Sequence, residues 1–243
     1  MPLRIAAYDT VDSTGNILKR FASLGEPEGL LIVAEQQTAG RGQYGRKFFS
    51  PKGSGIYFSL LLRPKSDAAE ATAITVIAAI AVSKAIEAIA GIPAGIKWVN
   101  DVICRGKKVA GILTEATLTS GGIAEYVHLG IGLNLYGGAF PDDIAAKAGG
   151  IFEREAPKDL RADLVAASVR EFYALYSKLP NGNFMSEYRS RSVLPGRRIL
   201  LTDEAGTRVV TAETIGDDAA LIVREASGES KILTSGRCKI ELI

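Results

Sequence analysis

One apolar run constrains the fold of this chain more than any other feature. Residues 71–90 have the sequence ATAITVIAAIAVSKAIEAIA, and the longest stretch without a charge, Ala71 to Ser83, covers 13 residues. A bilayer span needs about 20 apolar residues, so we do not expect this run to cross a membrane. We expect instead a buried, alanine-rich helix over 67–90. Asp67 and Glu70 fit a capping box at its start, and Gly91 fits its end.

A helix buried on all sides needs a large core around it, and the chain is long enough to supply one. It has 243 residues, of which 47% are hydrophobic and 23% charged, as in a globular protein with one large domain or one large and one small domain. The formal net charge of +2 does not indicate a wholly basic nucleic-acid binder.

Histidine and cysteine are scarce, which limits the chemistry of the chain. His128 is the single histidine, and the two cysteines are Cys104 and Cys238. A metal site with four His/Cys ligands is therefore impossible within one chain. Without a recognisable signal peptide, the two cysteines predict reduced thiols and a cytoplasmic location.

Strand-like and helix-like segments are interspersed, which predicts an α+β domain. Apolar runs predict strands, and apolar residues at helical spacing predict helices. The expected strands lie within 4–8, 30–36, 55–64, 96–118 and 123–135, and the further helices at 14–24 and 159–179.

The sequence changes character after Pro195. Short strand-like runs alternate with turns there, which predicts a small all-β module. We place the boundary near residue 190 and expect two domains, 1–190 and 191–243.

A glycine-rich segment, QTAGRGQYGRKFFSPKG at 37–53, follows one predicted strand. Its glycines match G-x-G-x-x-G, but a dinucleotide-binding motif would open a helix, and loop and strand follow here instead. Residues 36–66 carry six positive charges and no negative one. Glycine amides beside Arg41 and Arg46 suit phosphate or carboxylate oxygens. A merely solvated basic loop is the alternative.

A second basic constellation lies in the segment 97–113. If 97–101 is one continuous strand, Lys97, Val99 and Asp101 share a face, and residues 105–108 (RGKK) then make a turn. Lys97 at the start of a strand can hold an anion as a point charge. By spacing alone, Lys107 and Lys108 are better explained as ordinary turn lysines.

Five segments, taken in order, resemble the biotin–protein ligase family. They are VDST at 11–14, AEQQTAGRGQYGRKFFSP at 34–51, KWVND at 97–101, KKVAGIL at 107–113 and GIGLN at 130–134. The resemblance implies a class II synthetase-like (lipoate–biotin ligase) fold, in which helices pack on a mixed β-sheet. It also implies that the C-terminal module is an SH3-like β-barrel.

The implied reaction has two steps. Biotin and ATP with Mg²⁺ give biotinyl-5′-AMP and pyrophosphate, and a lysine of a biotin carboxyl carrier domain, from acetyl-CoA carboxylase or a related enzyme, then displaces AMP. Joining two anions is largely an electrostatic problem, so no nucleophilic side chain is needed. Only 11 residues precede Asp12, so we expect the ligase-only type, without sequence-specific DNA binding or a membrane partner. Many relatives form homodimers, and a homodimer is possible here.

The resemblance also implies roles for individual residues. The catalytic residues would be Lys108, Arg41 and Asp101, with Asp101 also holding Mg²⁺. The biotin-binding residues would be Ser13, Thr14, Gly15, Gln37, Gly40, Arg41, Gly42, Gln43, Lys108 and Gly111. The nucleotide-binding residues would be Arg46, Phe48, Lys97, Asn100 and Asn134.

Three positions depart from the family pattern. Gly15 stands where asparagine usually follows VDST, Gln43 where many relatives have arginine, and Phe48 where tryptophan is usual. We interpret His128 as a structural residue, and Glu115 as structural or supporting.

Two alternatives stay open at this point. A lipoate ligase or octanoyl transferase shares the catalytic fold, although the arginine-rich loop and the β-rich C-terminal module favour biotin. A nucleic-acid-binding module would use the basic segment 36–66, but it would need more stacking aromatics and a broader basic face.

Overall fold

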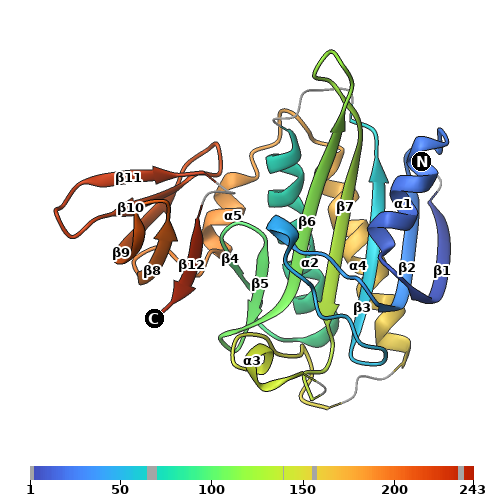
Figure 1. Cartoon of the computed structure of the whole chain (residues 1–243), viewed down its shortest axis with the longest axis horizontal. Helices are drawn as coiled ribbons and strands as arrows, with labels where there is room; N and C mark the ends of the chain where they lie inside the picture. The colour runs from blue at the N-terminus through green and yellow to red at the C-terminus, as the bar shows by residue number, and fades with distance from the viewer. Residues whose placement is uncertain (1–2, 65–69, 139, 155–157, 235–237) are drawn as a thin grey trace.

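The large domain is built on a seven-stranded sheet, seen in a computed structural model that describes residues 3–64, 70–138, 140–154, 158–234 and 238–243. The strand order is β1-β2-β3-β7-β6-β5-β4 (Figure 1). β1 and β2 pair in parallel, and the other neighbours are antiparallel. The strands are β1 (Arg4–Val11), β2 (Leu30–Gln37), β3 (Gly55–Leu62), β4 (Gly95–Lys97), β5 (Asp101–Cys104), β6 (Lys107–Leu118) and β7 (Ala124–Asn134).

Helices cover both faces of this sheet. α2 (Glu70–Ala90) and α4 (Lys158–Tyr176) lie behind it in Figure 1, and α1 (Thr14–Ser23) packs on the other face. Strand alternation explains the two layers, because Leu60 and Leu62 join the core on the α2 side while Leu61 joins the cluster under α1. The α+β prediction is confirmed.

The apolar run forms α2, as predicted. By length and composition alone, Ala71–Ala90 is long and apolar enough to cross a membrane. The shortness of its charge-free stretch is therefore not enough to exclude a membrane span. The burial of α2 identifies it as a core helix, because 67% of its most apolar window lies inside the protein. Gly91 ends the helix with φ +66°, and its N–H donates to the Glu87 carbonyl over 3.0 Å. The capping box cannot be followed, since Asp67 and the Glu70 side chain lie outside the described residues.

The prediction of one continuous strand through 97–101 is wrong. β4 ends at Lys97, residues 98–100 form a turn, and β5 begins at Asp101 and pairs back with Lys97. Lys97 and Asp101 are therefore partners on adjacent strands. Buried contacts hold this turn: the indole N–H of Trp98 donates to the Ala219 carbonyl over 2.7 Å, and Tyr188 donates to the Val99 carbonyl over 2.9 Å.

Three short helical segments have no counterpart in the sequence patterns. They are the 3₁₀ turn η1 (Gln43–Gly45), α3 (Asp142–Ala145) and α5 (Met185–Arg191). The predicted RGKK turn does form, with Arg105 and Gly106 at positive φ between the paired residues Cys104 and Lys107.

A second sheet of five antiparallel strands follows α5 and lies beside β4 and β5 (Figure 1). Its order is β11-β10-β9-β8-β12, which is consistent with an SH3-like module. The strands are β8 (Arg198–Asp203), β9 (Gly206–Ile215), β10 (Leu221–Arg224), β11 (Ser230–Leu233) and β12 (Lys239–Leu242). The proposed boundary at 190/191 falls at the last residue of α5 and stays a prediction.

Candidate active site

A cavity of about 190 Å³ lies on the α1 face of the large sheet. The loop between β2 and β3 crosses this face in front of β6 and β7 (Figure 1). Thirteen of the residues predicted from the sequence line it together: Ser13, Thr14, Gly15, Gln37, Arg41, Gly42, Gln43, Arg46, Phe48, Asn100, Asp101, Lys108 and Gly111.

Lys108 and Asp101 form an ion pair at one end of the cavity. The Lys108 ammonium lies 2.5 Å from a carboxylate oxygen of Asp101, and both side chains are partly exposed. Asn100 is fixed beside them, because its amide donates to the Ile112 carbonyl over 2.6 Å. The paired strands β5 and β6 thus place a cation, a carboxylate and an amide at one wall.

The Phe48 ring packs closely against the sheet because two strand positions there are glycine. A Cβ at Gly132 would lie 2.5 Å from the Phe48 ring, and one at Gly111 would lie 2.9 Å from it. The Lys108 ammonium is 5.8 Å from the ring centroid, within range of a cation–π contact. Gly111 therefore makes room for Phe48 and Lys108.

The opposite end of the cavity has a polar floor that the sequence patterns did not reveal. The buried Ser59 and His128 both line it, together with Glu115. Apart from a tyrosine, Ser59 is the only polar residue in the strand sequence GIYFSLLL. This isolated hydroxyl in an apolar strand is the sequence feature that could have indicated the polar floor. A Cβ at Gly15 would lie 2.6 Å from the His128 ring, so Gly15 makes space for this histidine.

The floor also fixes Gln37, which comes from the end of β2. Its side-chain oxygen accepts the Thr14 N–H over 2.9 Å at the start of α1, and its amide nitrogen donates to Ser50 over 3.0 Å. Because a backbone N–H can only donate, these contacts set the orientation of the Gln37 amide.

Only some of the positively charged side chains of the segment 36–66 line the cavity. Arg41, Arg46 and Lys47 line the cavity. Lys52 instead pairs with Asp9 over 2.5 Å, and Arg63 donates to backbone carbonyls around the end of α1. Lys65 lies outside the described residues.

Three predicted site residues do not line the cavity. Gly40 is buried within the loop, where a Cβ would meet the Phe48 carbonyl at 2.5 Å. Asn134 is buried, and its amide nitrogen lies 3.4 Å from the Lys108 carbonyl. Lys97 lines a neighbouring cavity of about 80 Å³ with Cys238, and burial lowers the pKa of its ammonium.

Comparison with known proteins identifies the class to which this fold and cavity belong. The chain matches the family described as the biotin/lipoate A/B protein ligase family over residues 7–134, more than half of its length. It belongs to that family.

The relatives it resembles carry more specific names. The chain is 32% identical over 231 residues to the bifunctional ligase/repressor BirA of Bacillus spizizenii, covering 93% of this chain and 71% of that one. It is 29% identical over 238 residues to the biotin–[acetyl-CoA-carboxylase] ligase of Mycobacterium tuberculosis, covering 94% and 86%. The structure of a biotin protein ligase from Aquifex aeolicus in complex with biotin and ATP matches 99% of both chains, with a TM-score of 0.82 and 26% identity.

Proposed function

We propose that this chain is a biotin protein ligase. It joins the biotin carboxylate to the α-phosphate of ATP, releasing pyrophosphate, and then transfers the biotinyl group to a lysine amine of a biotin carboxyl carrier domain, releasing AMP. The observation that carries the proposal is the composition of the cavity. Lys108, Arg41 and Arg46 bring positive charge to the cavity, and Thr14, Gln37 and Ser59 add hydroxyl and amide groups to its lining, while the Glu115 carboxylate is paired with Lys19. Such a cavity suits a ligand with a carboxylate tail and a polar, uncharged head.

Lys108 has the charge that the first step requires. The biotin carboxylate and the triphosphate repel each other, and a cation held between them lowers that barrier electrostatically. Asp101 holds the Lys108 ammonium at the cavity wall, and Arg41 and Arg46 add positive charge from the loop. We assign Phe48, Lys97, Asn100 and Asn134 to the nucleotide side on the family pattern.

Mg²⁺ belongs to the proposal as the companion of ATP. Asp101 is the carboxylate at the Lys108 end of the cavity, and the described residues contain no cluster of three His, Cys, Asp or Glu side chains for a metal. This donor set fits a metal held mainly by substrate phosphates and water, as is common for Mg²⁺. When bound, the metal would neutralise phosphate charge, and Asp101 is the residue that would contact it.

A mass measurement tests the proposal. The chain is incubated with ATP, Mg²⁺ and a biotin carboxyl carrier domain, once with biotin and once with lipoate. We expect the carrier to gain one biotinyl group and pyrophosphate to appear only with biotin. Equal or faster modification with lipoate, or no modification by either, would overturn it.

The cellular setting is also proposed. Cys104 and Cys238 are both free, and unpaired thiols are typical of a reducing compartment, which supports a cytoplasmic location. β1 is an edge strand of the large sheet and offers an open edge for a homodimer. Light scattering of the purified chain distinguishes a monomer from a dimer.

A further inference from the structure

The loop between β2 and β3 pairs with itself where it leaves the large sheet. The Gln37 N–H donates to the Ser50 carbonyl over 3.1 Å, and the Phe48 N–H donates to the Gly40 carbonyl over 2.9 Å. These two backbone bonds bring the outgoing and returning parts of the loop together. Ser50 therefore lies at the base of the loop, two residues after the aromatic ring that lines the cavity.

The Ser50 hydroxyl adds a second link at this base. It donates to the Phe48 carbonyl over 2.9 Å and accepts from the Gln37 side-chain amide over 3.0 Å. A carbonyl oxygen can only accept, and the Gln37 amide is oriented by the Thr14 N–H, so both directions are fixed. Ser50 is buried and does not line the cavity. No titratable group takes part in these bonds.

Gly40 is an independent sign that the loop is fitted around this hydroxyl. A Cβ at Gly40 would lie 2.5 Å from the Phe48 carbonyl oxygen, 2.6 Å from the Ser50 hydroxyl and 3.0 Å from the Gln37 amide nitrogen. These are the three groups that the two side-chain bonds join. Because a Cβ cannot approach other atoms so closely, the arrangement requires glycine at position 40.

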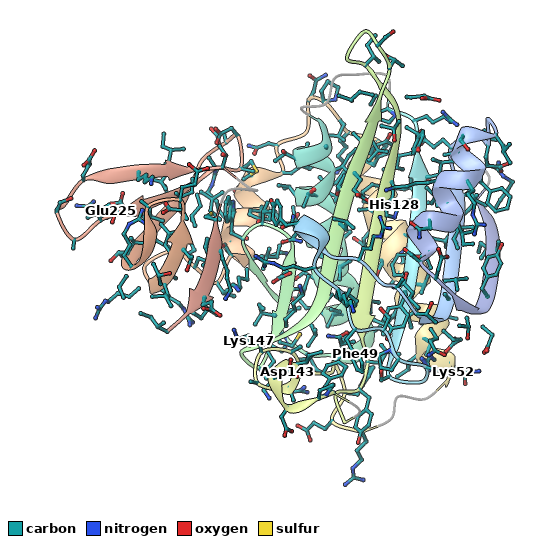
Figure 2. The ribbon with its side chains drawn as sticks, in the orientation of Figure 1. Phe49, Lys52, His128, Asp143, Lys147 and Glu225 are labelled. Atoms are coloured by element: carbon teal, nitrogen blue, oxygen red, sulfur yellow. The ribbon has the colours of Figure 1, made fainter. Side chains whose placement is uncertain are left out.

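The residues on either side of Ser50 are anchored to other elements. The Phe49 ring packs edge-on against Phe140, which follows β7, with ring centroids 5.9 Å apart, near the lower end of the sheet (Figure 2). On the other side, the Pro51 carbonyl accepts from the hydroxyl of Tyr57 on β3 over 3.0 Å. The base of the loop is thus fixed to the sheet, and the Ser50 hydroxyl ties the preceding main chain to it.

We propose that Ser50 is a positioning residue for the nucleotide: its hydroxyl holds the Phe48 main chain so that the Phe48 ring stays against Gly132 and faces the cavity. The inference rests on the proposed function, in which the Phe48 ring belongs to the nucleotide side. A ring already held in place loses little freedom when a purine base packs on it, so binding is tighter. Ser50 itself does not touch the ligand.

Biotin-dependent exchange of pyrophosphate into ATP tests the proposal. Ser50→Ala should raise the KM for ATP by about twofold to tenfold, the range for one neutral hydrogen bond, and change kcat by less than about twofold. The Kd for biotin, from calorimetric titration without ATP, should stay within about twofold, because Gln37 keeps its bond to the Thr14 N–H. An unchanged KM for ATP would overturn the proposal.

Ser54→Ala is the matched control. Ser54 is an equally buried serine four residues farther along the same loop, and its hydroxyl lies 3.4 Å from the Pro51 carbonyl instead of contacting Phe48. Its removal should leave the KM for ATP within about twofold. Equal increases in Ser50→Ala and Ser54→Ala would show a general loosening of the loop and would rule out a specific role for Ser50.

A double variant separates positioning from a purely structural role. Phe48→Ala alone should raise the KM for ATP at least as much as Ser50→Ala, and adding Ser50→Ala to it should raise the KM no further. Urea titration should still show a loss of stability from Ser50→Ala in both backgrounds, because the carbonyl at position 48 remains. The same rise in KM with and without the ring would overturn the role of Ser50. A wild type without biotin-dependent exchange would instead overturn the proposed function itself.

Discussion

Single side chains decide what the cavity can bind, and Lys108 gives the sharpest test. Lys108→Ala should lower the rate of biotin-dependent pyrophosphate release by about 10²- to 10³-fold, the usual cost of losing one charge-stabilising group. Lys107→Ala is the matched control, since the Lys107 ammonium donates to the Ala145 carbonyl at an exposed site. Its rate should stay within about twofold of the wild type. A Lys108→Ala enzyme less than tenfold slower would contradict the assignment.

The contact between Gly132 and Phe48 makes a second residue-scale prediction. A methyl group at Gly132 would lie 2.5 Å from the ring, so Gly132→Ala should lower the free energy of unfolding by about 1–3 kcal/mol. On a Phe48→Ala background the same change should cost much less, because the clash is gone. Urea titrations of the four proteins measure this coupling.

Gly121→Ala, where the nearest atom to the new methyl is 3.8 Å away, serves as the control for that cycle. It should change the unfolding free energy by no more than about 0.5 kcal/mol. Strictly additive effects of Gly132→Ala and Phe48→Ala would show that the ring does not rest on Gly132.

Sequence patterns identify candidate residues that lie in local motifs, but they do not identify residues whose structural partners lie far away in the sequence. Thirteen predicted residues line one cavity, and they were assigned through the resemblance to the ligase family, because by spacing alone Lys108 looks like an ordinary turn lysine. The sequence predicts only a structural role for His128. Its partner Ser59 lies 69 positions away, and Gly15, which makes room for the ring, is further still. No local pattern in the sequence connects these three positions.

At the scale of elements, most strands and long helices were predictable because their apolar spacing is local. The exception is the turn at 98–100, whose causes lie far along the chain. Trp98 is bonded to Ala219 in the C-terminal module, and Val99 to Tyr188 on α5. Because these partners are remote, the local sequence does not indicate the turn, and the segment is predicted as one continuous strand.

This turn carries a prediction about stability. Tyr188 is fully buried, and burial raises the pKa of its hydroxyl, which donates to the Val99 carbonyl. Tyr188→Phe leaves that carbonyl without its partner and should cost about 1–3 kcal/mol of unfolding free energy. Tyr44→Phe, at an exposed tyrosine of the loop, should be near neutral. Equal urea midpoints for the two variants would mean that the Tyr188 bond does not stabilise the turn.

At the scale of the whole molecule, the buried His128 in the cavity lining makes the stability of the fold depend on pH. Burial lowers the pKa of His128 below its ordinary value of 6.5, so the unfolded chain binds a proton more readily than the folded one. The stability is therefore complete above pH 6.5 and declines as the pH falls from 6.5 toward the folded pKa. Glu115 acts in a separate window. Its folded pKa of about 2 contributes stability above pH 4.5, which is lost as the pH falls from 4.5 toward 2.

These two windows can be measured separately because the chain has one histidine. Urea unfolding between pH 8 and pH 5 should show a falling free energy in the wild type and a level one in His128→Gln, since no other side chain ordinarily titrates there. Glu115→Gln should instead flatten the profile between pH 4.5 and pH 2. Parallel wild-type and His128→Gln profiles above pH 5 would show that the folded chain holds His128 with an ordinary pKa.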